Sequence, residues 1–532
     1  MNPTRPVNKK KTRISIGNAA ALLVVTGFVG QLLGFLRTKL VNANFPTTGP
    51  HSTDAYFAAF NIPDFFFFTL AAGALGVAFM PVLSDKYYHS TRKDVWEITA
   101  WLMNLMAIVM AVVAVIMIVF AKPLIHYIVA PGLPPDQLND AATIMRFLAF
   151  NPLLFTISGI FTSVQQTMGR FFFFAIAPLF YNMSIIISIY AFKDNIGLVG
   201  LGIGAFIGAV LQLLIVLFGL YKTGYRWFPK INFKSREFIT VLKNLPPRAI
   251  DQGMDQIGAI VETRIASGLT AGSITFFSNA YILSTAPILL IGTAISTAAF
   301  PRLNSDLSKG RPDLFRRDFL MVLRVMIWIS VPMVVIAYFA RGYLARIIYS
   351  NGSDEIATIF GFLTVAIFFR IMYAIMSRWF YAQKDTRTPL YVSLFTIALN
   401  IFLAVTLARP SAYGVAGLAL AQSIVAAVEV TIMGIIMIKR DHKLFDLQFL
   451  NGVFKIFAVT GFAVVACFVM ISLFPLGLND RGIFTLGAKL LMISGVTAIV
   501  YVGFSGLFGL EEVKPIYARL RKLILKPVNV KV

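Results

Sequence analysis

The sequence has 532 residues, of which 58% are hydrophobic and 13% are charged. A soluble domain carries about a quarter of charged residues to cover its surface, so this composition excludes a soluble protein of this size. The formal net charge of +23 has no recognisable nucleic-acid module beside it. We therefore interpret it as basic loops that face anionic membrane lipids, and we expect no nucleic-acid partner.

Apolar stretches long enough for a membrane span, about 20 residues, follow one another along the chain. The first of them is too long for the apolar region of a signal peptide. We predict an all-α polytopic membrane protein of about 14 transmembrane helices. The predicted spans are 14–40, 54–82, 95–121, 140–168, 171–192, 196–221, 246–268, 272–300, 318–340, 356–382, 388–408, 412–438, 450–474 and 484–509.

Basic residues concentrate in every second loop, as expected of loops that stay in the cytoplasm. The alternation persists along the chain, which predicts an even number of spans in a cell membrane with both termini cytoplasmic. The predicted segments are a basic cytoplasmic N-terminus (1–13), an N-lobe of six spans (14–222), a basic cytoplasmic linker (223–245), a C-lobe of six spans (246–440), two further spans (441–510) and a basic cytoplasmic tail (511–532).

An internal repeat relates the two halves of the chain. Pro81 and Pro301 close similar stretches of the second and eighth spans, and their positions differ by 220 (301 − 81). Asn182 and Asn400 follow similar stretches of the fifth and eleventh spans, and their positions differ by 218 (400 − 182). The repeat predicts two six-helix lobes related by a pseudo-two-fold axis along the membrane normal, plus two C-terminal helices. The alternative is chance likeness between apolar helices.

Four arginines lie within the predicted spans, where an ionisable group is costly unless it is paired or hydrated. Arg37 is near the outer end of the first span, Arg146 is in the fourth, Arg264 is near the outer end of the seventh, and Arg370 is near the middle of the tenth. We predict that these residues bind an anionic substrate. For Arg37 an equal alternative is snorkelling to the outer headgroups.

The seventh span carries three acids on one helical face. Asp251, Asp255 and Glu262 are spaced by four and seven residues, which is helical spacing. A stripe of acids facing lipid is physically implausible, so this face should line a wet cavity or pair with basic residues of the other lobe. Proton or cation coupling and a structural ion-pair network between the lobes are both compatible with the pattern.

A dense cluster of charges follows the tenth span, at Arg378, Lys384, Asp385 and Arg387. We predict a cytoplasmic gate there, and a tight basic loop is the alternative. The chain has no GxxxxGK[ST] nucleotide-binding loop, no catalytic constellation, one cysteine (Cys467) and four scattered histidines. We therefore expect no enzyme activity, no metal site and no cofactor. Transport energy would come from an ion gradient, the membrane potential or downstream consumption.

Three stretches of the sequence stand out: Leu33 to Arg37 with Thr53 to Asp64 and Gly73 to Pro81; Arg170 to Asn182; and Phe380 to Pro389 with Asn400. They resemble the MurJ/MviN family, the lipid II flippases of the multidrug/oligosaccharidyl-lipid/polysaccharide exporter superfamily. The third stretch is the most specific, and together with the number of spans the resemblance covers nearly the whole chain.

The resemblance implies alternating access, with a headgroup in a cationic central cavity and a polyprenyl tail along the last two helices. It assigns Arg37 to pyrophosphate binding, and Glu262 and Asn400 to the sodium site of some members. This chain departs from the pattern where the family has charged residues. The departures are Gln31, Thr38, Phe67, Ala72, Ala404 and the region of Tyr281-Ile282.

Our leading hypothesis is a flippase that moves an undecaprenyl-linked cell-wall precursor, lipid II, to the outer leaflet during peptidoglycan biosynthesis. The expected partners are that lipid, anionic membrane lipids and cell-wall synthesis proteins. The alternatives are an exporter of another polyprenyl-linked glycan or of an amphipathic cation, and a membrane scaffold that does not transport.

Overall fold

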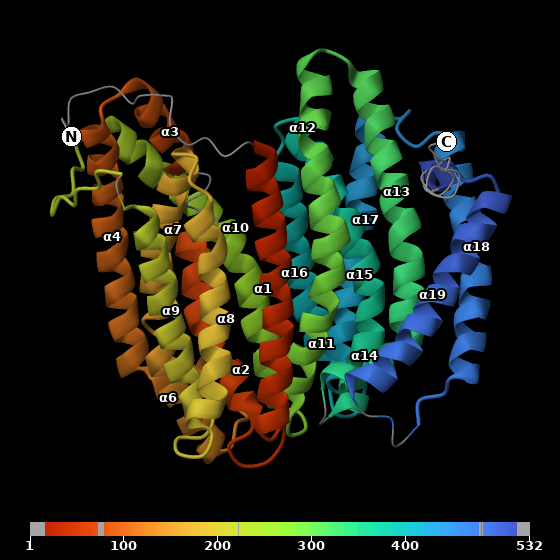
Figure 1. The fold of residues 1–532 in the computed structure, drawn as a ribbon, viewed down its shortest axis with the longest axis horizontal. Coiled ribbons are helices and arrows are strands. Elements are labelled where there is room, and N and C mark those ends of the chain that lie inside the picture. Colours follow the sequence, from red (N-terminus) through yellow and green to blue (C-terminus); the bar gives the residue numbers. More distant parts are fainter. Residues whose placement is uncertain are drawn as a thin grey trace, which may run out of the picture. The chain divides into compact units, whose positions relative to one another are not determined.

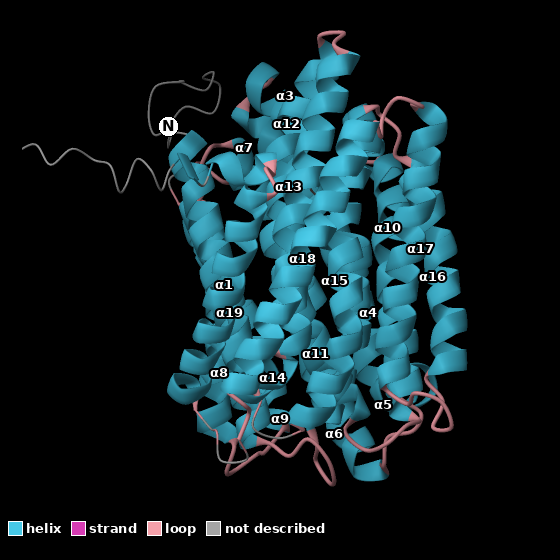
Figure 2. Ribbon diagram, turned by 90° about the vertical axis from the view of Figure 1, so that its right-hand side faces the viewer, coloured by secondary structure: helices cyan, strands magenta, loops and turns pink. Residues whose placement is uncertain are grey.

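The computed structural model describes residues 16–72, 79–221, 223–349, 352–477, 480, 482–515 and 517–518. These residues form helices and connecting loops, and no strand occurs among them (Figure 2). The described part of the chain is therefore all-helical, as the composition predicts. Contacts divide the chain into two compact units, Met1–Ser278 and Asn279–Val532, which we call the first and second units.

The first unit holds ten α-helices, two π-helical turns and the first turn of α11 within its described residues. Its elements are α1 (Ile16–Asn44), α2 (Thr53–Phe67), η1 (Phe68–Ala72), α3 (Met80–His89), α4 (Arg92–Val119), α5 (Ala121–Pro123), η3 (Leu124–Val129), α6 (Pro135–Leu148), α7 (Asn151–Thr167), α8 (Phe172–Phe192), α9 (Val199–Gly219), α10 (Arg236–Ser267) and the start of α11 (Ser273–Pro287).

The second unit contains the rest of α11 and the remaining described helices. Its elements are η4 (Ile288–Thr293), α12 (Ala294–Ser308), α13 (Pro312–Phe339), α14 (Arg341–Ile348), α15 (Ser353–Ala382), α16 (Arg387–Leu407), α17 (Ala416–Arg440), α18 (Leu447–Leu473), α19 (Ile483–Leu507) and the 3-10 turn η5 (Glu511–Val513).

Close backbone approach holds neighbouring helices of the first unit together. The helices α8 and α9 pack along their length (Figure 1), and a Cβ atom on Gly204 would lie only 2.1 Å from Oγ of Ser188. The hydroxyl of Ser184 donates a hydrogen bond to the carbonyl of Gly204 across the same contact (2.8 Å). Small residues allow such packing between apolar helices, where hydrophobicity alone does not choose a partner.

Helix bounds repeat along the chain with one offset. Two helices of the first half begin at positions that precede those of their counterparts by 220 (273 − 53), and the π-helical turns η1 and η4 begin at the same offset (288 − 68). The paired helix starts are Thr53 and Ser273, and Arg92 and Pro312. The predicted repeat therefore extends to secondary structure. The lobe bounds stay a prediction. The C-lobe is predicted to begin at residue 246, which lies within α10, and α10 packs against α2, η1 and η3 within the first unit.

Twelve helices among the described residues are long and apolar enough to cross a membrane. Each coincides with a predicted span, but the predicted number of 14 is not confirmed. The second predicted span divides into α2, η1 and α3, and residues 73–78 lie outside the described part. The seventh corresponds to α10, which carries Asp255, Glu262 and Arg264 and is too polar to count by hydropathy.

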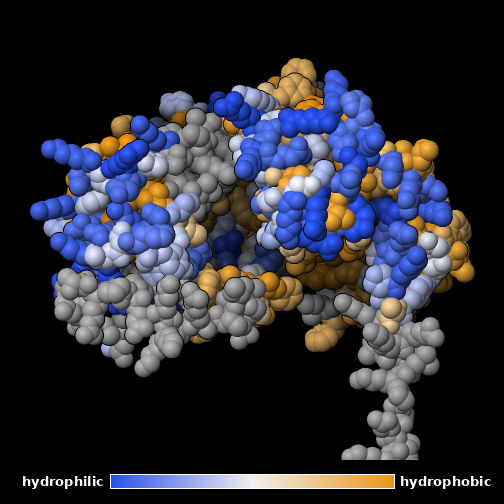
Figure 3. All heavy atoms as spheres, turned by 90° about the horizontal axis from the view of Figure 1, so that it is seen from above, coloured by the Kyte–Doolittle hydropathy of each residue, from blue (hydrophilic) through white to orange (hydrophobic). Residues whose placement is uncertain are grey.

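Hydrophilic side chains gather at helix ends in each unit, as Figure 3 shows where α3 stops in the first unit and, separately, where α13 begins in the second. Apolar side chains form the core of each unit. One cluster of the first unit surrounds Trp96, Phe161 and Phe238, and a smaller cluster of the second unit includes Tyr343 and Cys467. The distribution fits helices whose middle parts face lipid and whose ends face water.

Candidate functional site

Arg37 lies on α1 and is half-buried. Its charge interacts with that of Asp64 on α2, although no hydrogen bond or ion pair joins Arg37 to any described residue. A guanidinium offers five donors in a planar fork that matches phosphate oxygens. In the first unit, Arg37 therefore keeps its donors available for an anionic ligand.

Arg146 and Arg264 instead bind backbone carbonyls of the first unit. Arg146 on α6 is exposed and donates from Nε to the carbonyl of Ile118 (3.4 Å). Arg264 on α10 donates from Nη1 to the carbonyls of Tyr127 and of Ile128, the latter at 3.2 Å. Both carbonyls belong to the last turn of η3, where helical carbonyls lack intrahelical partners and a cation is favourable. Arg264 thus has a structural role that its position in the sequence did not reveal.

Arg370 lies in a polar cluster of the second unit. Its guanidinium donates to Oε1 of Gln422 on α17 (3.2 Å) and to the hydroxyl of Tyr281 on α11 (3.5 Å). The same guanidinium lies 5.8 Å from the centroid of the Tyr281 ring, within cation–π distance. Two of the groups that hold Arg370 are therefore neutral, an amide and a tyrosine.

The residues predicted to couple transport to an ion fall in both units. Glu262 on α10 is buried and Asp255 is exposed, whereas the side chain of Asp251 lies outside the described ones. Next to Glu262, the hydroxyl of Thr263 donates to Oδ1 of Asn61 on α2 (3.2 Å). Asn400 lies half-buried on α16 of the second unit. The face of α10 that the acids share is thus partly buried.

The predicted gate residues divide into bound and exposed groups. Asp385 accepts hydrogen bonds from the amides of Arg387 and Thr388 (3.0 Å each) and from the Thr388 hydroxyl (2.6 Å). It also forms an ion pair with Arg440 at the end of α17 (2.7 Å). Burial alone would raise the pKa of Asp385, but the bonds from Thr388 and Arg440 outweigh it and lower the pKa to about 2.

Of the other three gate candidates, Arg378 packs against aromatic rings and the other two are exposed. The Arg378 guanidinium lies over the rings of Phe300 (5.4 Å) and Tyr381 (5.9 Å). Lys384 is exposed and has a left-handed backbone (φ 62°), and Arg387 is exposed. Asp385 therefore closes the turn between α15 and α16 onto α17, while Lys384 and Arg387 face outward.

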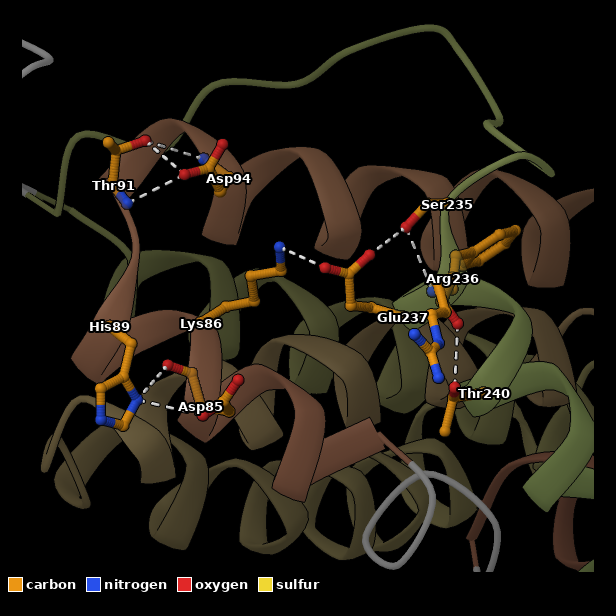
Figure 4. Close-up of polar contacts among 10 residues, drawn as sticks. Asp85, Lys86, His89, Thr91, Asp94, Ser235, Arg236, Glu237 and Thr240 are labelled. Carbon is orange, nitrogen blue, oxygen red and sulfur yellow. Dashed lines mark hydrogen bonds and ion pairs between the residues drawn. The ribbon is translucent and has the colours of Figure 1, made fainter.

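A second set of ionic contacts lies at the end of the first unit where α3 stops and α10 begins (Figure 4). Lys86 on α3 forms an ion pair with Glu237 in the first turn of α10 (2.8 Å). Hydrogen bonds from Lys86 and then from Ser235 lower the pKa of Glu237 to about 2. This pair joins the end of the second predicted span to the start of α10.

Asp54 is a buried acid that the sequence analysis did not select. It lies at the start of α2, is 4% exposed, and accepts hydrogen bonds from the amides of Gly272 (2.9 Å) and Thr275 (2.8 Å) and from the Thr275 hydroxyl (2.6 Å). These groups lie at the N-terminus of α11, whose amides have no partner within the helix. Asp54 thus caps α11 from a distant part of the sequence.

Glu429 is a second acid that sequence reasoning missed, on α17 of the second unit. Its Oε1 lies 3.3 Å from the hydroxyl of Ser393 and 3.5 Å from that of Thr396, both on α16. An ionisable residue within a predicted span was the available signal. Among the described residues, no group of three His, Cys, Asp or Glu side chains could hold a metal ion.

Comparison of the chain with known proteins identifies its family. A model of the family described as lipid II flippase MurJ matches residues 50–490, which is most of the chain. The chain belongs to the MurJ family. The predicted resemblance is therefore confirmed.

Curated members of the MurJ family align along nearly their whole length. A probable lipid II flippase MurJ of Borreliella burgdorferi is 24% identical over 485 residues, covering 90% of this chain and 94% of the relative. One of Buchnera aphidicola subsp. Acyrthosiphon pisum is 25% identical over 499 residues, covering 91% and 95%. These alignments thus span most of this chain and most of both relatives.

Solved structures share the fold. A lipid II flippase MurJ in an inward closed conformation matches with a TM-score of 0.77 at 21% identity, covering 92% of this chain and 98% of that one. A transporter of the MOP superfamily from Pyrococcus furiosus matches less well, with a TM-score of 0.58 at 14% identity over 82% of this chain. The predicted all-α polytopic membrane fold is confirmed, although its number of 14 spans is not.

Proposed function

We propose that this protein is a flippase for lipid II, moving the undecaprenyl-linked precursor from the cytoplasmic to the outer leaflet by alternating access. The observation that carries the proposal is the family match over residues 50–490. It is supported by curated relatives named probable lipid II flippase MurJ. A transporter of this kind needs no catalytic group, and we propose no enzyme activity.

The pyrophosphate of such a cargo needs compensating positive charge in a low-dielectric cavity. Arg37 supports this role because its donors are not used by any described residue. Arg370 supports it in a second way: its guanidinium reaches Tyr281, near which the family resemblance implies an arginine. We propose that these two residues bind pyrophosphate, and that Arg146 and Arg264 contribute less because they bind carbonyls.

Complementation of a strain depleted of its lipid II flippase tests the function directly. We expect the chain to restore growth and precursor export, and Arg37→Ala and Arg370→Ala to lose export at normal membrane levels. The matched control is Arg409→Ala, an exposed arginine just after α16, which should complement fully. A correctly inserted chain that never restores export would favour the scaffold alternative.

The acids of α10 are our candidates for the residues that couple transport to an ion gradient. We propose that protons or cations are exchanged during the cycle by three acids and one amide, Asp251, Asp255, Glu262 and Asn400. A separate proposal is that the charged residues after the tenth predicted span form the cytoplasmic gate: Arg378, Lys384, Asp385 and Arg387. Glu262→Gln should slow export and change its dependence on the ion gradient. Equal dependence in the variant and the parent would remove Glu262 from this role.

We propose that both termini are cytoplasmic, because the basic segments alternate along the chain. Cys467 is buried, so single exposed cysteines can report sidedness. An impermeant maleimide should label Ser411→Cys, after α16, in intact cells, and should label Ser308→Cys, at the end of α12, only after lysis. The reverse pattern would invert the topology.

A further inference from the structure

A pocket of about 490 Å³ opens at one end of the second unit. It is formed by α13, by the start of α18 and by the segment that follows α19, and α13 packs against α18 (Figure 1). Its volume falls within the range of about 300–1,000 Å³ that is usual for small-molecule sites. No substrate or gate residue predicted from the sequence lines it.

The base of the pocket is a network of ion pairs around two carboxylates. Arg324 on α13 pairs with Glu511 (3.1 Å) and with Glu512. The absence of a side chain at Gly452 on α18 admits the guanidinium, since a Cβ there would lie 2.9 Å from Nη1 of Arg324. Glu511 also pairs with Lys514 (3.9 Å), so among the described residues Glu512 depends on Arg324 alone for a positive charge.

One oxygen of this base lacks a partner. The Glu512 side chain is 2% exposed, and its Oε2 atom is buried with no hydrogen-bond partner among the described residues. A buried carboxylate oxygen without a donor is costly. A ligand that brings a positively charged donor would remove this cost.

The residues that line the pocket carry a small excess of negative charge. Four carboxylates and three guanidiniums line it, a net formal charge of −1. Arg316 is bound to both oxygens of Asp441 (2.8 and 3.0 Å). Arg317 is 66% exposed, and its ion pair with Asp318 is long (3.7 Å). Arg317 is therefore the cation that can turn to a phosphate, and the acids at the base favour an ammonium group.

The pocket also has an apolar side. Leu320, Met321 and Val325 of α13 and Phe449 of α18 line it, and Met321 is 54% exposed. Both helices are candidate membrane spans, and α18 begins directly after Asp446. Charged and apolar groups thus meet where the helices leave the membrane, which suits an amphiphile with its head at the surface.

We propose that this pocket binds a phospholipid whose headgroup carries a primary ammonium. The ammonium donates to Oε2 of Glu512, the phosphate is bound by Arg317, and the first methylenes of the lipid lie along Met321. An anionic lipid without an amine would add charge to a negative pocket, and a quaternary ammonium has no N–H to donate.

Native mass spectrometry of the purified full-length protein tests the proposal. The protein is mixed with equal amounts of phosphatidylethanolamine, phosphatidylglycerol and phosphatidylcholine with identical acyl chains. We expect one ethanolamine lipid to be retained about tenfold over each of the others, which corresponds to about 1.4 kcal/mol. Equal retention of the three lipids would overturn the proposal.

Three variants separate the charge from the shape of the site. Glu512→Gln should abolish the preference for ethanolamine, and Met321→Trp should reduce retention by filling the pocket without altering its charge. The control Glu355→Gln changes an exposed acid in the first turn of α15 and should keep the preference. An unchanged preference in Glu512→Gln would overturn the assignment of the ammonium.

A soluble headgroup distinguishes a lipid from a free amine. Glycerophosphoethanolamine, added at the concentration of the lipid, should fail to displace it, because the soluble headgroup lacks the apolar contacts. Full displacement would show that the pocket binds a small soluble amine and would overturn the lipid assignment.

Discussion

Asp54→Asn should destabilise the first unit although the two side chains have nearly the same shape. The carboxylate accepts bonds on both oxygens, from Gly272 on Oδ2 and from Thr275 on Oδ1. An amide can present only one acceptor oxygen. In either orientation its NH₂ group faces a backbone N–H, so one buried donor of α11 loses its partner.

The expected cost follows from these contacts. A buried donor left without a partner costs about 1–3 kcal/mol, and a hydrogen bond to a charged group contributes about 1.5–3 kcal/mol. Loss of a negative charge at a helix N-terminus adds about 0.3–1 kcal/mol. Since these terms overlap, we expect Asp54→Asn to cost about 2–4 kcal/mol and Asp54→Ala roughly 1 kcal/mol more.

Thermal unfolding in detergent measures the effect. The scan rate is kept fixed because multi-span proteins unfold irreversibly, which makes the midpoint depend on the scan rate. The expected decrease in the midpoint is roughly 3–7 °C for a unit of the length of Met1–Ser278. The control Asp194→Asn alters an exposed acid in the loop after α8 and should change the midpoint little. A midpoint for Asp54→Asn equal to that of the control would refute the capping role.

Three further predictions concern other contacts. Gly204→Leu should prevent folding, because its Cβ would lie 2.1 Å from Oγ of Ser188. Gly487→Ala has open space at its Cβ and should be tolerated. Expression level and gel filtration measure both outcomes. Arg264→Met should lower thermal stability by about 1–3 kcal/mol, since the carbonyls of Tyr127 and Ile128 lose a charged donor; an unchanged midpoint with lost export would instead favour substrate binding. Because the pKa of Asp385 is lowered to about 2 from 3.8, its bonds to Thr388 and Arg440 should stabilise the protein above about pH 4, by about 1–2 kcal/mol once solvent screening is included, an effect lost as the pH falls towards 2. Asp385→Asn should lack that acid-dependent loss, and the same pH profile in both proteins would contradict it.

Membrane class and the position of most helices follow from the sequence. Hydropathy averaged over about 20 residues is a local property, and it locates the twelve apolar helices. The repeat seen in Pro81 and Pro301 is also sequential information, and helix starts such as Arg92 and Pro312 keep its offset. Hydropathy is a poor guide to α10, where charged residues share a face with apolar ones.

The roles of individual charged residues depend on the tertiary structure. Asp54 belongs to a stretch that resembles the MurJ family, yet its partners Gly272 and Thr275 lie in a remote part of the sequence. Arg264 and Arg370 look equivalent in the sequence as cations within spans. Folding gives Arg264 two helix-terminal carbonyls and gives Arg370 an amide and a tyrosine. A side chain's free energy depends on the groups that desolvate it and bind it, and only the folded chain brings those groups together.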